Sequence, residues 1–269
     1  MVALGGERRR ERFGQIFLLA VQSRALLAWC HAQLGTFAEG RAFGDEGLRI
    51  AEEIDHPGGL MWAFWGIALL ALRQGDLSRA LPLLERAMGL CQDAGFQLFL
   101  PLLAADLVAA YTLARRVADA VPLLTQATGR VGDWGRSQVA LGEAQRLAGH
   151  LEEAHALAEH ARALTRERRQ RGLQAYALHL LGAIAAQREP PERQQAEAHY
   201  QQALALAEEL SMRPLVAHCH HGLGTLYATS GQREQARTAL STALEMYRSM
   251  EMTFWLPQVK AALTQVEGR

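Results

Sequence analysis

Residues 223–244 read Leu223-Gly224-x-x-Tyr227-x-x-x-Gly231-x-x-x-x-Ala236-x-x-x-Leu240-x-x-Ala243-Leu244. Small and large apolar residues recur at helical spacing on both sides of a turn glycine, so the segment predicts two helices joined by a short turn. Related patterns return about every 40 residues, six times along the chain. A period of this length is typical of solenoids, in which each unit buries its apolar face on its neighbours.

The repeat is marked by an alanine that opens the second helix of each unit and by another alanine seven residues later. The pairs are Ala80 and Ala87, Ala120 and Ala127, Ala154 and Ala161, Ala196 and Ala203, and Ala236 and Ala243. An earlier unit keeps the register with Gly40 and Gly47. Small residues two turns apart lie on one face of a helix, where they let another backbone approach closely. The spacing therefore predicts helix-on-helix packing.

These residues resemble the tetratricopeptide repeat (TPR), a helix-turn-helix unit with a Leu-Gly pair in its first helix, a turn glycine and the alanines above. The resemblance covers residues 21–247, with further Leu-Gly-like pairs at Ile67-Ala68, Leu141-Gly142 and Leu181-Gly182. It is weaker where Arg115 replaces the turn glycine. The resemblance implies an all-α fold, an α-solenoid forming a right-handed superhelix of about six TPR-like repeats with a C-terminal capping helix.

The pattern also predicts where the helices lie. The expected pairs are 15–33 with 37–54, 60–73 with 77–93, 99–114 with 117–130, 136–148 with 151–168, 171–187 with 192–210, and 214–229 with 233–249. The run from His56 to Gly59 is expected to break the chain before the second unit. We expect a tail at 1–14, a superhelical domain at 15–250 and a capping helix within 251–269, with Phe254, Trp255 and Leu263 packed inward.

A narrower resemblance is carried by runs such as Gln74-Gly75-Asp76-Leu77 and Met212-Arg213-Pro214-Leu215-Val216-Ala217-His218-Cys219-His220. They are similar to the C-terminal repeat region of large bacterial signalling proteins that join an adenylate-cyclase-like domain or a STAND-type ATPase to a helical array. The resemblance implies a sensor or regulatory arm, with ATPase or cyclase domains attached in a longer protein. The sole lysine is Lys260, so the chain has no G-x-x-x-x-G-K-[ST] phosphate loop, and nucleotide chemistry is not carried over.

Composition argues against several classes of function. With 28 acidic and 28 basic residues the net charge is zero, so we expect neither nucleic acid nor a membrane surface as a partner. The three cysteines are too few and too scattered for a disulfide framework, which indicates a reducing cytoplasm. No catalytic motif stands out, so we expect a protein that is not an enzyme and has no cofactor.

The resemblance also implies that the first helices line a concave groove that binds a protein or peptide. Residues outside the Leu-Gly packing set are then the candidates for contact with the partner. These are Trp29, Trp62, Trp65, Arg73, Arg136, Glu143, Arg146, Tyr176, His179, His218 and His221.

The tryptophan and arginine candidates each have an alternative role. Trp62 and Trp65 could anchor an apolar side chain of a bound peptide or fill the space between adjacent first helices. Arg136 and Arg146 could hold a carboxylate, or stay solvated or pair internally with Glu143.

The function expected is therefore protein interaction and scaffolding. One alternative is a regulatory domain that senses a small molecule at its aromatic end. A weaker one is a metal-dependent hydrolase built on His179, His218 and His221, although the segment offers no fourth ligand at a recognised spacing. The chain could also form a homodimer through an N-terminal edge that exposes Phe13, Ile16 and Phe17.

Overall fold

A computed structural model of the chain describes residues 17–116, 119–120, 123 and 135–268. Every regular element in these ranges is a helix, which confirms the predicted all-α class. The chain divides into two compact units, residues 1–130 (unit 1) and residues 131–269 (unit 2). The domain boundaries expected after residues 14 and 250 stay predictions.

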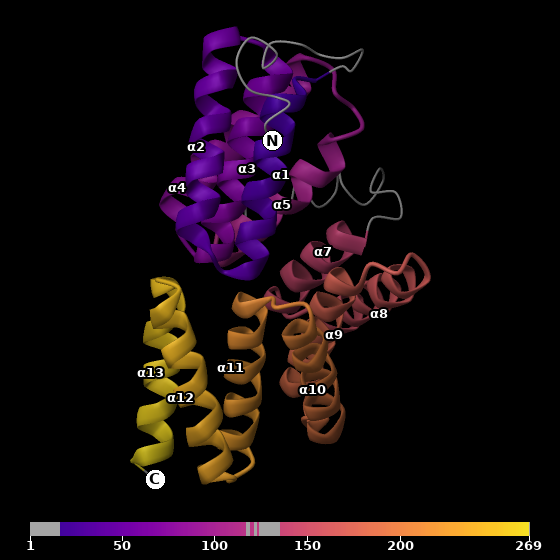
Figure 1. Cartoon of the computed structure of the whole chain (residues 1–269). Helices are drawn as coiled ribbons and strands as arrows, with labels where there is room; N and C mark the ends of the chain where they lie inside the picture. Colours follow the sequence, from indigo (N-terminus) through magenta and orange to yellow (C-terminus); the bar gives the residue numbers. More distant parts are fainter. Residues whose placement is uncertain (1–16, 117–118, 121–122, 124–134, 269) are drawn as a thin grey trace. The chain divides into compact units, whose positions relative to one another are not determined.

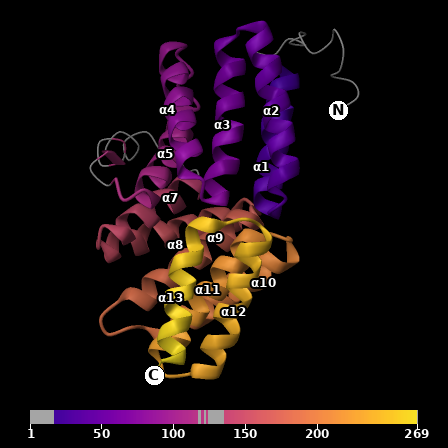
Figure 2. The ribbon, with the colours of Figure 1, turned by 90° about the vertical axis from the view of Figure 1, so that its left-hand side faces the viewer.

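Unit 1 is built from helical hairpins (Figure 1). Its described helices are α1 (Leu19–Leu34), α2 (Phe37–Ile54), α3 (Pro57–Gln74), α4 (Leu77–Asp93) and α5 (Leu100–Leu113). Helices α1 and α2 form one antiparallel pair, and α3 and α4 form the next. Figure 2 shows α2, α3 and α4 lying side by side, as expected when successive hairpins stack. The second helix predicted for the third repeat, 117–130, lies almost wholly outside the described residues.

Unit 2 repeats this arrangement and ends in a cap. Its helices are α7 (Gly135–Leu147), α8 (Leu151–Glu167), α9 (Arg171–Gln187), α10 (Arg193–Glu209), α11 (Arg213–Thr229) and α12 (Arg233–Ser249), followed by the short 3₁₀ turn η3 (Thr253–Trp255) and α13 (Leu256–Glu267). Each helix packs on its hairpin partner and on the neighbouring hairpin, so within each unit the architecture is that of a solenoid. No helix of the described ranges has both the length and the apolar character needed to cross a membrane.

The alanine register is confirmed as the packing core. The described alanines of the five pairs are 0 or 1% exposed, and only Ala127 lies outside the described residues. Gly40 and Gly47 are buried in α2 at the equivalent positions. Because these side chains are so small, the backbones of neighbouring helices approach closely in the described parts of each unit.

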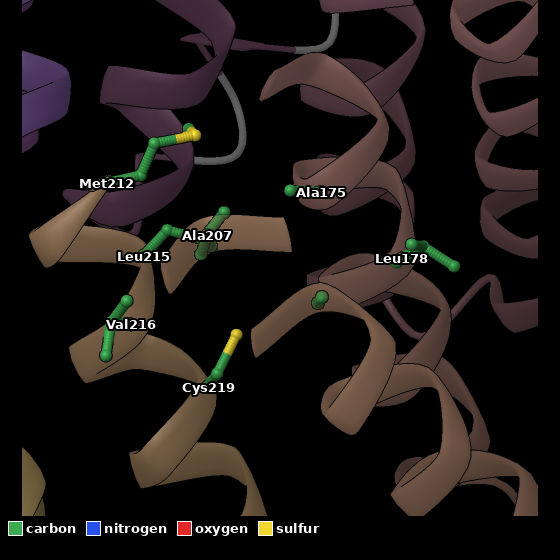
Figure 3. Close-up of a cluster of buried hydrophobic side chains, with 8 residues drawn as sticks. Ala175, Leu178, Ala207, Met212, Leu215, Val216 and Cys219 are labelled. Carbon is green, nitrogen blue, oxygen red and sulfur yellow. The ribbon is translucent and has the colours of Figure 1, made fainter. Parts of the chain in front are cut away.

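One apolar cluster of unit 2 shows how this packing works (Figure 3). Met212, the N-cap residue of α11, and Leu215, Val216 and Cys219 of α11 meet Ala175 and Leu178 of α9 and Ala203 and Ala207 of α10. Figure 3 shows the Cys219 side chain directed from α11 toward the preceding hairpin. Burial raises the pKa of the Cys219 thiol to about 12, so this cysteine stays protonated as a small apolar group.

The turns inside most hairpins use a left-handed residue. Gly75 ends α3 with a φ of 84°, and Asp76 then caps α4 by accepting a hydrogen bond from the Arg79 amide. Arg115, which replaces the expected glycine after α5, adopts the same left-handed region with a φ of 57°. The repeat geometry thus persists where the sequence pattern weakens.

Two expectations for the N-terminal part are wrong. Helix α3 begins at Pro57, not near residue 60, because proline is well suited to the first helical position, while Gly58 and Gly59 leave room for Phe17 and Leu18. Phe17 is only 8% exposed, so it offers no apolar surface for a homodimer. Phe13 and Ile16, the other two residues of that proposed edge, lie outside the described residues.

The capping helix is confirmed in part. Trp255 is buried at 9% exposure, and Phe254 and Leu263 are half-buried. The cap contacts both α11 and α12 and so covers the last hairpin.

A close approach of the first helices α1 and α3 in unit 1 gives a test of this packing. A Cβ at Gly66 of α3 would lie 2.8 Å from both Cα and Cβ of Ala25 in α1, whereas a Cβ at Gly89 of α4 would meet no atom within 4 Å. We predict that Gly66→Ala destabilises the protein by about 1–3 kcal/mol through overpacking. Gly89→Ala should instead be neutral or stabilising by up to about 1 kcal/mol, because alanine favours helix.

Denaturant unfolding followed by circular dichroism measures both changes. Equal effects of the two substitutions would contradict the close approach of α1 and α3.

Candidate binding site

The predicted tryptophans of unit 1 belong to a cluster of packed rings. The ring centroids of Trp29 and Trp65 are 4.9 Å apart, those of Trp62 and Trp65 are 5.3 Å apart, and those of Trp29 and Trp62 are 5.6 Å apart. Phe99 and Phe17 meet the cluster edge-on, with centroids 5.5 and 6.1 Å from that of Trp62. These distances are typical of favourable aromatic contacts.

A buried carboxylate fixes one tryptophan of this cluster. The indole N–H of Trp65 donates to Oδ2 of Asp106 over 2.7 Å, and this hydrogen bond joins α3 to α5. Trp65 is 1% exposed and Asp106 is 5% exposed. A charged acceptor in so dry a place makes a strong hydrogen bond and orients the ring.

The burial of Trp62 (5%) and Trp65 favours the packing role, which the sequence left open. Trp29 is half-buried in α1, and Arg73 is half-buried in the last turn of α3. A partner contact by these four residues stays a prediction, and Trp29 and Arg73 are the accessible members of the group.

In unit 2 the structure joins two of the charged candidates to each other. Arg146 donates to Glu143 through Nε (2.9 Å) and through a second guanidinium nitrogen (2.6 Å). It also donates to Oε1 of Gln187 over 2.8 Å, which links α7 to α9. This is the internal pair that the sequence allowed as an alternative, and it leaves Arg146 less free to hold a partner's carboxylate. Arg136 is half-buried in the first turn of α7.

The histidine candidates of unit 2 gather where two hairpins meet. The ring of His179 in α9 lies 6.2 Å from that of His218 in α11 and 5.5 Å from that of Tyr200 in α10. His221, one helical turn after His218, lies 6.2 Å from the ring of Tyr247. We call His179, His218 and His221 the histidine cluster. All three are half-buried.

The cluster continues into the C-terminal cap. Nδ1 of His218 lies 2.7 Å from the hydroxyl of Tyr247, which donates to it when that nitrogen carries no proton. The His218 ring also meets Trp255 edge-on, with centroids 4.8 Å apart. The sequence predicted Trp255 only as a packing residue of the cap and did not single out Tyr247. Both residues belong to later elements, η3 and α12, so their contacts with His218 are visible only in the structure.

The ring of Tyr200, from α10, lies between α9 and α11 beside the histidine cluster. A Cβ at Gly182 of α9 would lie 2.9 Å from the Tyr200 ring, and a Cβ at Gly222 of α11 would lie 2.6 Å from it. Both glycines are therefore needed to let this 5% exposed ring lie between α9 and α11. The sequence marks Gly182 through its Leu-Gly pair, but Gly222 is recognisable only once the ring is placed.

Burial dominates the electrostatics of the cluster. It lowers the pKa of His221 to about 4, and the neighbouring His179 adds to this effect. Burial also lowers the pKa of His179, with opposing influences from Glu143 and Arg146. Burial raises the pKa of Tyr200 and of Tyr247. His179 and His221 are therefore neutral near pH 7 and can both donate and accept hydrogen bonds.

Tyr176 lies on α9, three residues before His179, and is half-buried. Helical spacing places it on the same face as His179. Three consecutive first helices of unit 2, α7, α9 and α11, thus carry Arg136, Glu143, Arg146, Tyr176, His179, His218 and His221. The other four candidates lie in unit 1.

The metal-site alternative finds no ligand set. Across the residues that the structure describes, no three side chains of His, Cys, Asp or Glu are grouped so that they could hold a metal ion. The imidazole of His218 contacts Tyr247 and Trp255, neither of which is a usual zinc ligand.

Comparison with known proteins agrees with this architecture. A family model described as tetratricopeptide repeat matches residues 173–249, which span most of the hairpins α9–α10 and α11–α12. No curated protein matches the chain in sequence.

Several solved structures are similar in fold. A Rap protein complexed with competence and sporulation factor is 12% identical with a TM-score of 0.65, over 91% of this chain and 85% of that chain. BtubC (BKLC) from P. vanneervenii is 17% identical with a TM-score of 0.52, over 82% and 92% of the two chains. The apo form of RapI is 13% identical with a TM-score of 0.53, over 92% and 71%. With the repeat match, these similarities show that the chain has a tetratricopeptide-repeat fold, an all-α solenoid of helical hairpins.

Proposed function

We propose that the chain is an interaction module that binds a protein or peptide on the first helices of unit 2. The site is the surface formed by Arg146, Tyr176, His179, His218 and His221 on α7, α9 and α11, which we call the first-helix face. The observation that carries the proposal is the gathering of half-buried polar and aromatic side chains on this face. The packing core of the hairpins is supplied by the buried alanines and not by these side chains. Such groups are typical of binding surfaces, where they offer both ring area and hydrogen bonds.

The chemistry of the face favours an uncharged partner segment. Arg146 and Glu143 neutralise each other, and burial keeps His179 and His221 neutral near pH 7. Neutral imidazoles can hydrogen-bond to backbone or side-chain amides, while Tyr176 offers a ring and a hydroxyl group.

The similar structures support a binding role. The Rap protein with the same fold was solved in complex with competence and sporulation factor. By analogy of fold, we propose that this chain also acts by holding a partner.

We further propose that the module is the sensor or regulatory arm of a larger bacterial signalling protein, with ATPase or cyclase domains attached, and that it works in the cytoplasm. The runs quoted for the narrower resemblance support this context, and the described cysteines are free thiols, as expected in a reducing compartment. Homodimerisation remains a separate prediction, without the support of Phe17.

The first-helix face can be tested by a double substitution. We predict that Tyr176→Ala combined with His179→Ala weakens binding of the partner by about tenfold or more, because it removes central ring contacts and hydrogen bonds. The partner can be found first by placing a photo-crosslinking amino acid at position 176 in cells and identifying the adduct. Its affinity for each purified variant is then measured by calorimetry.

The matched control is Glu234→Ala with Arg237→Ala, which removes an exposed ion pair from the second helix α12. This variant should bind with unchanged affinity, and a crosslinker at position 237 should give no adduct. Loss of binding in the control but not in the test variant would place the site on the second helices and refute the proposal.

A second candidate function, sensing of a small molecule, is favoured by one observation in unit 1. The indole nitrogen of Trp62 is buried and has no hydrogen-bond acceptor within the described part of the chain. A buried donor without a partner is costly, and a ligand with an acceptor atom would satisfy it. The surrounding rings would suit an apolar or aromatic body for such a ligand.

This candidate makes a fluorescence prediction. A metabolite that binds in the aromatic cluster should shift the indole emission and raise the melting temperature of the protein. Trp62→Phe keeps a ring but removes the N–H donor, so it should weaken that ligand by roughly 5- to 10-fold, in line with one lost hydrogen bond.

Trp255→Phe in unit 2 serves as the control and should leave the ligand's affinity unchanged. If no metabolite in a broad library alters the emission or the melting temperature, the small-molecule function is contradicted and the interaction module remains the proposed function.

A further inference from the structure

The contact between the last two hairpins of unit 2 contains an unusual concentration of imidazoles. His179 comes from the hairpin α9–α10, and His218 and His221 come from the hairpin α11–α12. His179 and His218 face each other across this contact, with ring centroids 6.2 Å apart. The three histidines therefore lie at a joint between two hairpins, which are also held by apolar packing and by the hydrogen bond from the Tyr227 hydroxyl to Glu197.

The groups that surround the cluster offer little compensation for added positive charge. From α7, the carboxylate of Glu143 faces His179, but it is already bound twice by Arg146. From α10 and α12 come the phenols of Tyr200 and Tyr247, which burial keeps protonated. From the cap comes the uncharged ring of Trp255. A proton on His221 would thus face the neighbouring imidazole of His179 and aromatic rings.

The packing of Tyr200 leaves little room for small shifts between the two hairpins. Its ring fills the space between Gly182 and Gly222 so closely that a single added carbon on either glycine would overlap it. This ring therefore opposes small shifts of α9 against α11. Because the three imidazoles are only half-buried, they already reach some water, and separation of the two hairpins would hydrate them fully.

We propose that this joint is a proton-sensitive device, in which protonation of His179 and His221 opens the contact between the hairpins α9–α10 and α11–α12. The closed joint binds fewer protons than the open one, because an open joint returns the imidazoles to water. Stability of the contact is then complete above pH 6.5, the usual His value, and is lost as the pH falls toward about 4, where His221 itself titrates in the closed state. This inference concerns the fold of unit 2 and holds whether or not a partner binds there.

Native-state hydrogen exchange on the full chain tests the proposal, with rates corrected for the intrinsic pH dependence of exchange. Between pH 7 and pH 5 we expect the protection of amides in α9 and α11 to fall on the order of tenfold, because the open joint takes up protons that the closed joint excludes. Amides of α3 in unit 1 provide the internal reference and should change less.

Substitution separates the joint from general acid sensitivity. His221→Gln carries no titratable group, so its α9 and α11 amides should lose severalfold less protection on acidification than those of the wild type. His160→Gln, at an exposed position of α8, is the matched control and should behave as the wild type does. A His221→Gln variant that loses as much protection as the wild type would overturn the proposal.

A measurement on the unsubstituted protein guards against a variant that fails to fold. Imidazole proton signals followed by NMR should show that His179 and His221 take up protons only together with the loss of protection in α9 and α11. Titration of both rings near pH 6.5 in a protein whose exchange protection does not change would also overturn the proposal.

Discussion

The structure depends on the close approach of helix backbones at small residues. The buried alanine pairs repeat this contact along each unit, and Gly66 against Ala25 is an extreme case, with no room for one added carbon. Once the backbones are this close, the positions of larger side chains are fixed, since interiors pack at near-crystalline density. The tryptophans of unit 1 and Tyr200 of unit 2 lie where this spacing leaves gaps between hairpins.

The same constraint gives the candidate site its character. In unit 2 the gaps between first helices hold polar rings where an all-apolar core would be expected, and burial sets their protonation. The face thus combines hydrogen-bonding capacity with little charge, which is compatible with a partner recognised by shape and by amide groups. The pairing of Arg146 with Glu143 and Gln187 adds rigidity to this face but little net field.

The sequence predicts the repeat architecture well because alanine spacing and turn glycines report local packing. Helices α2, α4, α9 and α12 begin and end at the predicted residues. The start of α3 is missed, since Pro57 and two glycines read as a break when Phe17 and Leu18 are not yet placed. Which candidates are accessible depends on how the neighbouring hairpins pack, and residue spacing within one repeat does not give that. The burial of Trp65 depends on Asp106, 41 residues later, and the role of Gly222 depends on Tyr200.

The restriction of contacts to adjacent hairpins has a mechanical consequence. In unit 2 the main contacts run between adjacent hairpins, so a force applied to its two ends acts on these interfaces in series. Each interface can then rupture separately, in steps of one helical pair, so the unit can behave as an extensible spring.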